Sequence, residues 1–270
     1  MPHGYSSTAT LEPMPPLSTR EYLVVAGGLV GIALVGWAYM AYMAWAMSNM
    51  DTVSMWMPPM GPMAWGAWDF TMLFAMWATM MVAMMTPSAL PMVSMFATLS
   101  RNRRLRKQPY TSTFVFLAGY LIAWTAFSVA ATAAQWLLHT TSLLSPMMES
   151  RNYLMSGGVL IVAGIYQWTP LKNACLHTCR SPLGFLIAEW REGKGGALVM
   201  GIRHGVYCVG CCWALMLVLF AVGVMNILWV ILIAAFVVIE KLMPAPALLR
   251  IISGLALVAW GGYFVILHLS

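Results

Sequence analysis

Long apolar stretches recur along almost the whole chain and are separated by short polar or proline-containing breaks. A helix needs about 20 apolar residues to cross the hydrocarbon core of a bilayer. Seven stretches approach or exceed this length, at residues 22–48, 70–99, 112–138, 153–170, 205–224, 226–242 and 247–268. Because lipid cannot satisfy backbone hydrogen bonds, each must be helical. The pattern predicts an all-α, polytopic membrane helical bundle with about seven transmembrane helices, forming a single membrane domain over residues 1–270.

The division between the fifth and sixth stretches rests on a weak signal. No proline lies between Ala197 and Lys241, and only Gly223–Asn226 has the composition of a tight turn. A single helix over this range, rising about 1.5 Å per residue, is too long for a bilayer. A break is therefore expected at Gly223–Asn226, with six helices as the alternative. In the first stretch, Gly27 and Gly31 have the spacing that lets a second helix approach closely.

Charge is scarce and is placed in short loops. Only 8% of residues are charged, against about 25% in soluble domains. Residues 101–107 carry five positive charges, and 171–203 carry five more. The positive-inside rule places both segments in the cytoplasm, together with the polar tail at residues 1–20. Because the net charge of +6 resides mainly in such loops, it indicates topology rather than nucleic-acid binding.

Methionine is concentrated in the first third of the chain, where 16 of the 25 residues lie between Met40 and Met95. The second stretch carries one row at four-residue spacing and a shorter row beside it: Met72, Met76, Met80 and Met84, then Met81 and Met85. Residues four apart on a helix lie about 5–6 Å apart at Cβ, which predicts a continuous row of thioethers. Thioethers suit Cu(I), whereas core packing is the alternative explanation. Asp69, which precedes the row, is a helix N-cap by preference and a metal ligand only as a second choice.

All five cysteines lie between Cys175 and Cys212. Four ligand-type residues share one face of a helix, at positions i, i+4, i+7 and i+8: His204, Cys208, Cys211 and Cys212. Cys175 and Cys179 are also four apart, and His177 between them is a ligand only if this segment is not a regular helix. An odd cysteine count on a reducing side disfavours disulfides. Thiolates and imidazoles in this number predict a site for Cu(I), with zinc as the alternative.

Glu240 ends the sixth stretch on the side expected to be cytoplasmic. A carboxylate near or inside a membrane is a functional candidate by default. It is expected to form an ion pair with Arg203 or Lys241, while metal binding and proton relay are the other possibilities.

Several of these segments resemble the signature of a bacterial family of predicted metal-binding integral membrane proteins, catalogued as a domain of unknown function. The similarity covers roughly residues 65–265 and is carried by the following residues: Tyr166, Gln167, Thr169, Pro170, Leu171, Lys172, Cys175, Leu176, Cys179, Arg180, Ser181 and Pro182; Gly201, Arg203, His204, Gly205, Tyr207, Cys208, Gly210, Cys211, Cys212, Trp213, Leu215 and Met216; Gly223–Asn226; Glu240 and Lys241; and Met84, Met85 and Pro87. The resemblance implies metal binding in a bacterial inner membrane. His177 lies outside the pattern.

The hypothesis we favour is a multi-pass Cu(I)-binding protein with its N-terminus inside. Copper would pass from the methionine-rich loop and helix at 49–99 to the cysteine- and histidine-rich region at 171–212. One alternative is a membrane redox or electron-transfer subunit with a copper or thiol centre; another is a structural subunit of a larger complex. A non-enzymatic role is favoured, because no paired carboxylates, nucleotide loop or haem motif points to a reaction. The expected partners are a metal ion, membrane lipid, and either a second protein or another copy of the chain.

Overall fold

The computed structural model describes residues 17–51, 53–54, 56–59, 65–144, 152–243 and 246–269. This part of the chain contains nine helices: α1 (Thr19–Ser48), α2 (Ala67–Leu105), α3 (Thr113–Thr140), α4 (Tyr153–Gln167), α5 (Pro170–Arg180), α6 (Pro182–Glu189), α7 (Gly193–Val222), α8 (Ile227–Leu242) and α9 (Pro246–Leu269). All seven apolar stretches are helical, so the predicted all-α class is confirmed. The polar tail at 1–16 and Met55, Met60 and Met63 of the methionine-rich loop lie outside the described residues.

Five helices, α1, α2, α3, α7 and α9, are long and apolar enough to cross a membrane. Helix α4 reaches that length only together with α5, and the two are bent by 63° at Trp168–Thr169. Helix α8 has 16 residues and is therefore about 24 Å long, shorter than a hydrocarbon core of about 30 Å. The number of crossings thus stays a prediction, although every segment on which it rests forms a helix.

The expected break after the fifth stretch is present, and its chemistry is local. Gly223 has φ 98°, in the left-handed region that favours glycine, and it ends α7. The side chain of Asn226 then accepts a hydrogen bond from the Leu228 N–H at 3.2 Å and begins α8. The start of α7 is different from the prediction, because the helix begins at Gly193 rather than near residue 205. Glycines and the charged Lys194 and Arg203 mask the apolar pattern there, and the cysteines consequently lie in the middle of the helix.

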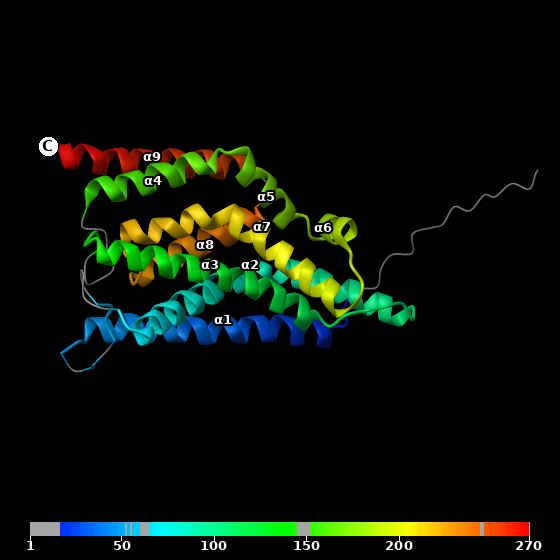
Figure 1. Cartoon of the computed structure of the whole chain (residues 1–270). Coiled ribbons are helices and arrows are strands. Elements are labelled where there is room, and N and C mark those ends of the chain that lie inside the picture. Colours follow the sequence, from blue (N-terminus) through cyan, green and yellow to red (C-terminus); the bar gives the residue numbers. More distant parts are fainter. Residues whose placement is uncertain are drawn as a thin grey trace, which may run out of the picture.

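The helices lie side by side in a bundle (Figure 1), with α1 at one edge and the α4–α9 pair at the opposite edge. Helices α2, α3, α7 and α8 lie between them, and α7 contacts both α3 and α5. The start of α1 and the end of α9 lie at opposite ends of the bundle.

Segments expected in the cytoplasm meet at one end of the bundle. Arg101 pairs with Glu21 at 3.0 Å, which joins the end of α2 to the start of α1. Arg103 pairs with Glu192 at 2.7 Å, which joins α2 to the segment between α6 and α7. The charged segments 101–107 and 189–203 therefore share the end at which α1 begins, as a common side of the membrane requires.

Glycine sets the closest helix contacts. A Cβ on Gly201 of α7 would collide with the Phe116 carbonyl of α3, and one on Gly205 would lie 3.0 Å from the Tyr120 carbonyl. Only glycine lets these two backbones touch, and the contact presses Tyr120 against the middle of α7. The close approach expected at Gly27 and Gly31 is not found among the described residues, since none of their atoms lies within 4 Å of a Cβ built at either position.

Candidate metal site

The methionine rows of α2 lie inside the bundle. Met76, Met80 and Met84 are buried, as are Met81 and Met85 in the second row, whereas Met72 at the start of the helix is only half-buried. All five buried thioethers belong to one continuous apolar core with α3 and α7. Burial agrees with a sheltered path for a soft cation and agrees equally with core packing. The contacts at the inner end of the row distinguish these two explanations.

Helix α5 is built to present its cysteines to α7. Thr169 caps the helix by accepting a hydrogen bond from the Lys172 N–H at 3.3 Å, and Pro170 occupies the first turn. Cys175 and Cys179 then lie on the buried face of α5. The Tyr166 hydroxyl donates to the Gly210 carbonyl and ties the end of α4 to α7. A Cβ on Gly210 would lie only 2.8 Å from the Cys175 sulfur, so glycine makes room for this thiol.

The cysteines of the two helices form one cluster, which we call the thiol cluster: Cys175, Cys179, Cys208, Cys211 and Cys212. Cys179 lies on the buried face of α5, which packs on the part of α7 that carries Cys208 and Cys211. The Cys211 and Cys212 thiols donate to the Cys208 carbonyl at 3.1 and 3.0 Å. Within the described ranges, no group of three or more His, Cys, Asp or Glu side chains is arranged to hold a metal ion. The thiols are gathered, but two of them point at the backbone and must rotate to face a common ion.

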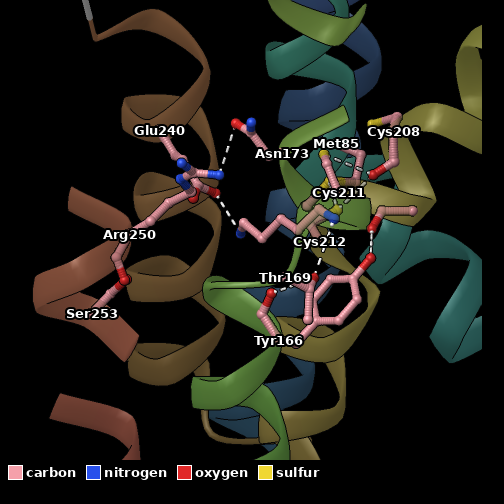
Figure 2. Close-up of polar contacts among 12 residues, drawn as sticks. Met85, Tyr166, Thr169, Asn173, Cys208, Cys211, Cys212, Glu240, Arg250 and Ser253 are labelled. Atoms are coloured by element: carbon pink, nitrogen blue, oxygen red, sulfur yellow. Dashed lines mark hydrogen bonds and ion pairs between the residues drawn. The ribbon is translucent and has the colours of Figure 1, made fainter. Parts of the chain in front are cut away.

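The methionine row and the thiol cluster touch each other. The Cys212 sulfur lies 4.0 Å from the Met85 sulfur, and both side chains are fully buried. Figure 2 shows Met85 beside Cys208, Cys211 and Cys212. The contact falls on the second methionine row rather than on Met84. A thioether and a thiol, both candidate ligands for a soft metal ion, are thus adjacent within the bundle.

Cys208 lies at the centre of a polar network. The Lys241 ammonium donates to the Cys208 sulfur at 3.0 Å and to the Ser88 hydroxyl at 2.9 Å. The Tyr120 hydroxyl lies 3.2 Å from the same sulfur and donates to the Met85 carbonyl at 3.1 Å. Four helices, α2, α3, α7 and α8, therefore meet around one thiol.

Glu240 forms an ion pair, but with a different partner from the one expected. Its carboxylate accepts a hydrogen bond from the Lys172 ammonium at 2.9 Å, and both side chains are almost completely buried. Arg203 pairs instead with Glu189, and Lys241 turns toward Cys208. The prediction of Arg203 or Lys241 as the partner is wrong, because Lys172 in α5 reaches α8 only through the bend between α4 and α5, which the sequence pattern does not reveal.

The two histidines of the region differ. His204 is buried on the same side of α7 as Cys208, and its ring packs against Phe116, Tyr120 and Phe185 with centroids 5.6–6.1 Å apart. Its Nδ1 has no hydrogen-bond partner in the structure as described. His177 is exposed on α5, which is a regular helix, so the condition for its role as a ligand is not met.

Asp69 stabilises the start of α2. It occupies the third position of the helix, and Gly66 is the N-cap, which corrects the expected N-cap assignment. Its carboxylate accepts hydrogen bonds from the Gly66 N–H at 2.9 Å and from the Trp56 indole at 2.8 Å. These contacts place a negative group at a helix N-terminus, where it is favourable.

Sequence reasoning missed the polar partners of the cluster, Lys172, Lys241, Tyr120 and Ser88, as contributors to the site. The available signal was a lysine three residues before Cys175 and another beside Glu240, in segments that are otherwise apolar. Lys172 and Lys241 are two positive charges, and Glu240 can neutralise only one of them. A cysteine thiol is the other acidic group available near the second lysine.

The fold and the site define an α-helical bundle with a buried cluster of thiols and thioethers. The family model described as PpoB2, copper chaperone, matches residues 74–264, and the chain belongs to this family. The match includes every cysteine and all of the buried methionines of α2 named above. It identifies the expected metal-binding family as one related to copper. No curated protein and no solved structure matches the chain.

Proposed function

We propose that this protein is a multi-pass Cu(I) chaperone of a bacterial inner membrane, which receives copper on the thioethers of α2 and delivers it to the thiol cluster. The observation that carries the proposal is the buried contact of 4.0 Å between the Met85 and Cys212 sulfurs. It joins two sets of soft ligands that are far apart in the sequence. Membership of a copper chaperone family supports copper rather than zinc as the ion.

Ligand charge gives the transfer a direction. Neutral thioethers hold a soft monovalent cation without adding negative charge to an apolar region. Thiolates bind the same ion more strongly because they also neutralise its charge. The methionine row begins near the end of the bundle opposite the basic segments, and the thiol cluster lies beside its inner end, at Met85. Copper would therefore move toward the side that carries residues 101–107, which the positive-inside rule assigns to the cytoplasm.

Charge balance favours Cys208 as the first thiol to bind copper. Lys172 and Lys241 are both buried, and among the described residues Glu240 pairs with Lys172 while Lys241 has no carboxylate partner. A buried ammonium without a counter-charge is costly. A Cys208 thiolate in contact with Lys241 removes that cost and is the form of cysteine that binds metal. Copper would then compete with the Lys241 ammonium for this sulfur, which would leave Lys241 its contact with Ser88.

The test is the copper content of protein purified in detergent under anaerobic, reducing conditions after Cu(I) loading. Wild type is compared with a variant carrying Cys208→Ser, Cys211→Ser and Cys212→Ser. We expect near-stoichiometric copper in wild type and its loss in the triple variant. Serine is close to cysteine in size and keeps a group that donates and accepts hydrogen bonds, but it cannot form a thiolate. A matched size-exclusion profile controls for folding. Equal copper in both proteins, or preferential loading of zinc, would overturn the proposal.

A further inference from the structure

A second feature of the bundle lies between α8 and α9, away from the thiol cluster. Helix α9 packs mainly on α4 and only lightly on α8, and a groove of about 360 Å³ lies between α9 and its neighbours α7 and α8. Its walls are almost entirely apolar and include Trp229, Phe236, Leu257 and Trp260. On α9 the lining residues follow the helical spacing 253, 256, 257 and 260, so the groove runs along the helix axis.

The groove has a cationic end. Ser253 is the polar residue of the lining, and Arg250 lies one helical turn before it on the same face, with the Ser253 hydroxyl donating to the Arg250 carbonyl at 3.2 Å. The Arg250 guanidinium donates to the Asn173 side chain at 2.9 Å, and its Nε is buried without a hydrogen-bond partner. Figure 2 shows Arg250, Asn173 and Ser253 together beside Glu240.

This end of α8 and α9 has more positive than negative charge. Arg180 donates hydrogen bonds to the backbone carbonyls of Lys241 and Met243, and these carbonyl groups carry no formal charge. Glu240 is hydrogen-bonded to Lys172. Over the described ranges, neither Arg180 nor Arg250 forms an ion pair with a carboxylate. Two guanidinium groups are therefore left without a carboxylate partner, and one of them, Arg250, lies at the end of the apolar groove.

We propose that the groove and Arg250 form a binding site for one anionic phospholipid. One acyl chain would lie along the groove against Trp229 and Trp260, and the phosphate would be held by Arg250, with Arg180 adding to the attraction. Guanidinium groups bind phosphate through paired N–H donors, and basic pockets between helices on the cytoplasmic side bind anionic headgroups. The proposal rests on the membrane location and orientation inferred above.

A lipid at this position would stabilise the packing of α5 and α8, the helices that hold the thiol cluster and its charged partners. Asn173 belongs to α5, which carries Cys175 and Cys179, and α8 carries Glu240 and Lys241. A headgroup bound to Arg250 would link α9 more firmly to both helices. Helix α8 contacts α9 only lightly, and a hydrogen bond between Arg250 and Asn173 joins α9 to α5. The bound lipid would therefore raise the thermal stability of the protein.

The experiment uses full-length protein, delipidated in mild detergent, and compares phosphatidylglycerol with phosphatidylcholine of identical acyl chains. Native mass spectrometry measures retention of lipid, and a thermal melt measures stability. We expect one phosphatidylglycerol to be retained with a higher melting temperature, and phosphatidylcholine to be bound at least about fivefold more weakly. Glycerol phosphate, which has the headgroup chemistry without the chain, should give no stabilisation.

Two variants test the two halves of the site separately. Arg250→Gln removes the charge and should abolish the preference for phosphatidylglycerol, whereas Arg106→Gln removes an exposed charge remote from the groove and should leave it intact. Ala256→Trp fills the groove and should abolish retention of both lipids while Arg250 is unchanged. Equal retention of the two lipids by wild type, or an unchanged preference in Arg250→Gln, would overturn the proposal. Because copper loading is measured on the same preparations, failure of the lipid site is distinguishable from failure of the metal site.

Discussion

The methionine rows of α2 and the thiol cluster between α5 and α7 are both buried and meet at Met85 and Cys212, yet they are held in place by different forces. Met76, Met80 and Met84 belong to an apolar core in which their side chains are fixed by packing. Cys208, in contrast, is contacted by Lys241 and Tyr120, and its backbone carbonyl accepts hydrogen bonds from two further thiols. The thioethers of the methionine rows are held by packing, whereas the thiols of the cluster already take part in hydrogen bonds.

Under the proposed function, this difference would separate two tasks of a copper carrier, passing the ion along and holding it. A cation passes quickly between neutral ligands that hold it weakly and equally. It stops where charge and hydrogen bonding favour one position. Packing also tolerates exchange between residues of similar volume, whereas a buried polar network does not tolerate the loss of a single member. Substitutions should therefore affect stability strongly at the inner end and affect transfer rate at the outer end.

The largest effect on stability is expected from Glu240→Gln. This change leaves the buried Lys172 ammonium without its counter-charge, and breaking a buried pair in this way costs about 3–5 kcal/mol. Chemical denaturation in detergent should show the loss. Removal of both charges by Lys172→Met with Glu240→Met should restore most of the stability. Glu189→Gln breaks the exposed pair with Arg203 and should cost at most about 1 kcal/mol. Equal losses for Glu240→Gln and Glu189→Gln would contradict the distinction between the inner network and the surface.

Much of the architecture was accessible from the sequence, because each element carries a strong local signal. Apolar length predicted all seven helical stretches, and the Gly223–Asn226 turn predicted the break between α7 and α8. The start of α7 was missed because Lys194 and Arg203 interrupt the apolar pattern. Helix α5 was missed for a related reason, since its 11 residues are amphipathic and too short to register as a membrane helix.

The site was less accessible, because its partners come from separate helices. Spacing alone placed Cys208, Cys211 and Cys212 on one face of a helix, and it placed the methionines in rows along a different helix. Spacing contains no information about which helices are neighbours. The contact between Met85 and Cys212, the pair formed by Lys172 and Glu240, and the position of Lys241 at Cys208 all depend on that arrangement.

An intermediate effect is expected from Met76→Leu combined with Met80→Leu, and it should appear in rate rather than in stability. Leucine preserves apolar volume at a cost usually below about 1.5 kcal/mol, but it removes both thioether sulfurs from the row. Cu(I) uptake into proteoliposomes should fall about tenfold or more, a loss typical of weakened metal ligation. Equilibrium copper content should stay unchanged, because the thiol cluster is intact.

The control for this experiment is Met200→Leu combined with Met225→Leu, which changes two buried methionines of α7 and the following turn that lie outside the rows. Its uptake should match wild type. If both double variants transport copper at the wild-type rate, the methionines of α2 are core packing and the path to Cys212 begins elsewhere. If both lose transport together, the effect comes from packing and not from ligation.

The smallest effect is expected from His177→Gln, although His177 lies between two cysteines of the cluster. On a helix it is offset by two residues from both Cys175 and Cys179, so its side chain projects from a different face, and it is exposed while they are buried. Copper content and Cu(I) affinity, measured by competition with a chromophoric chelator, should equal those of wild type. His204→Gln is the matched change at a buried position of α7 four residues before Cys208, where the unpartnered Nδ1 lies beside the cluster. A weaker Cu(I) affinity in His204→Gln alone would add the His204 imidazole to the metal site. A weaker affinity in His177→Gln would contradict the prediction, because His177 can reach an ion held by Cys175 and Cys179 only if α5 unwinds or rotates when copper binds.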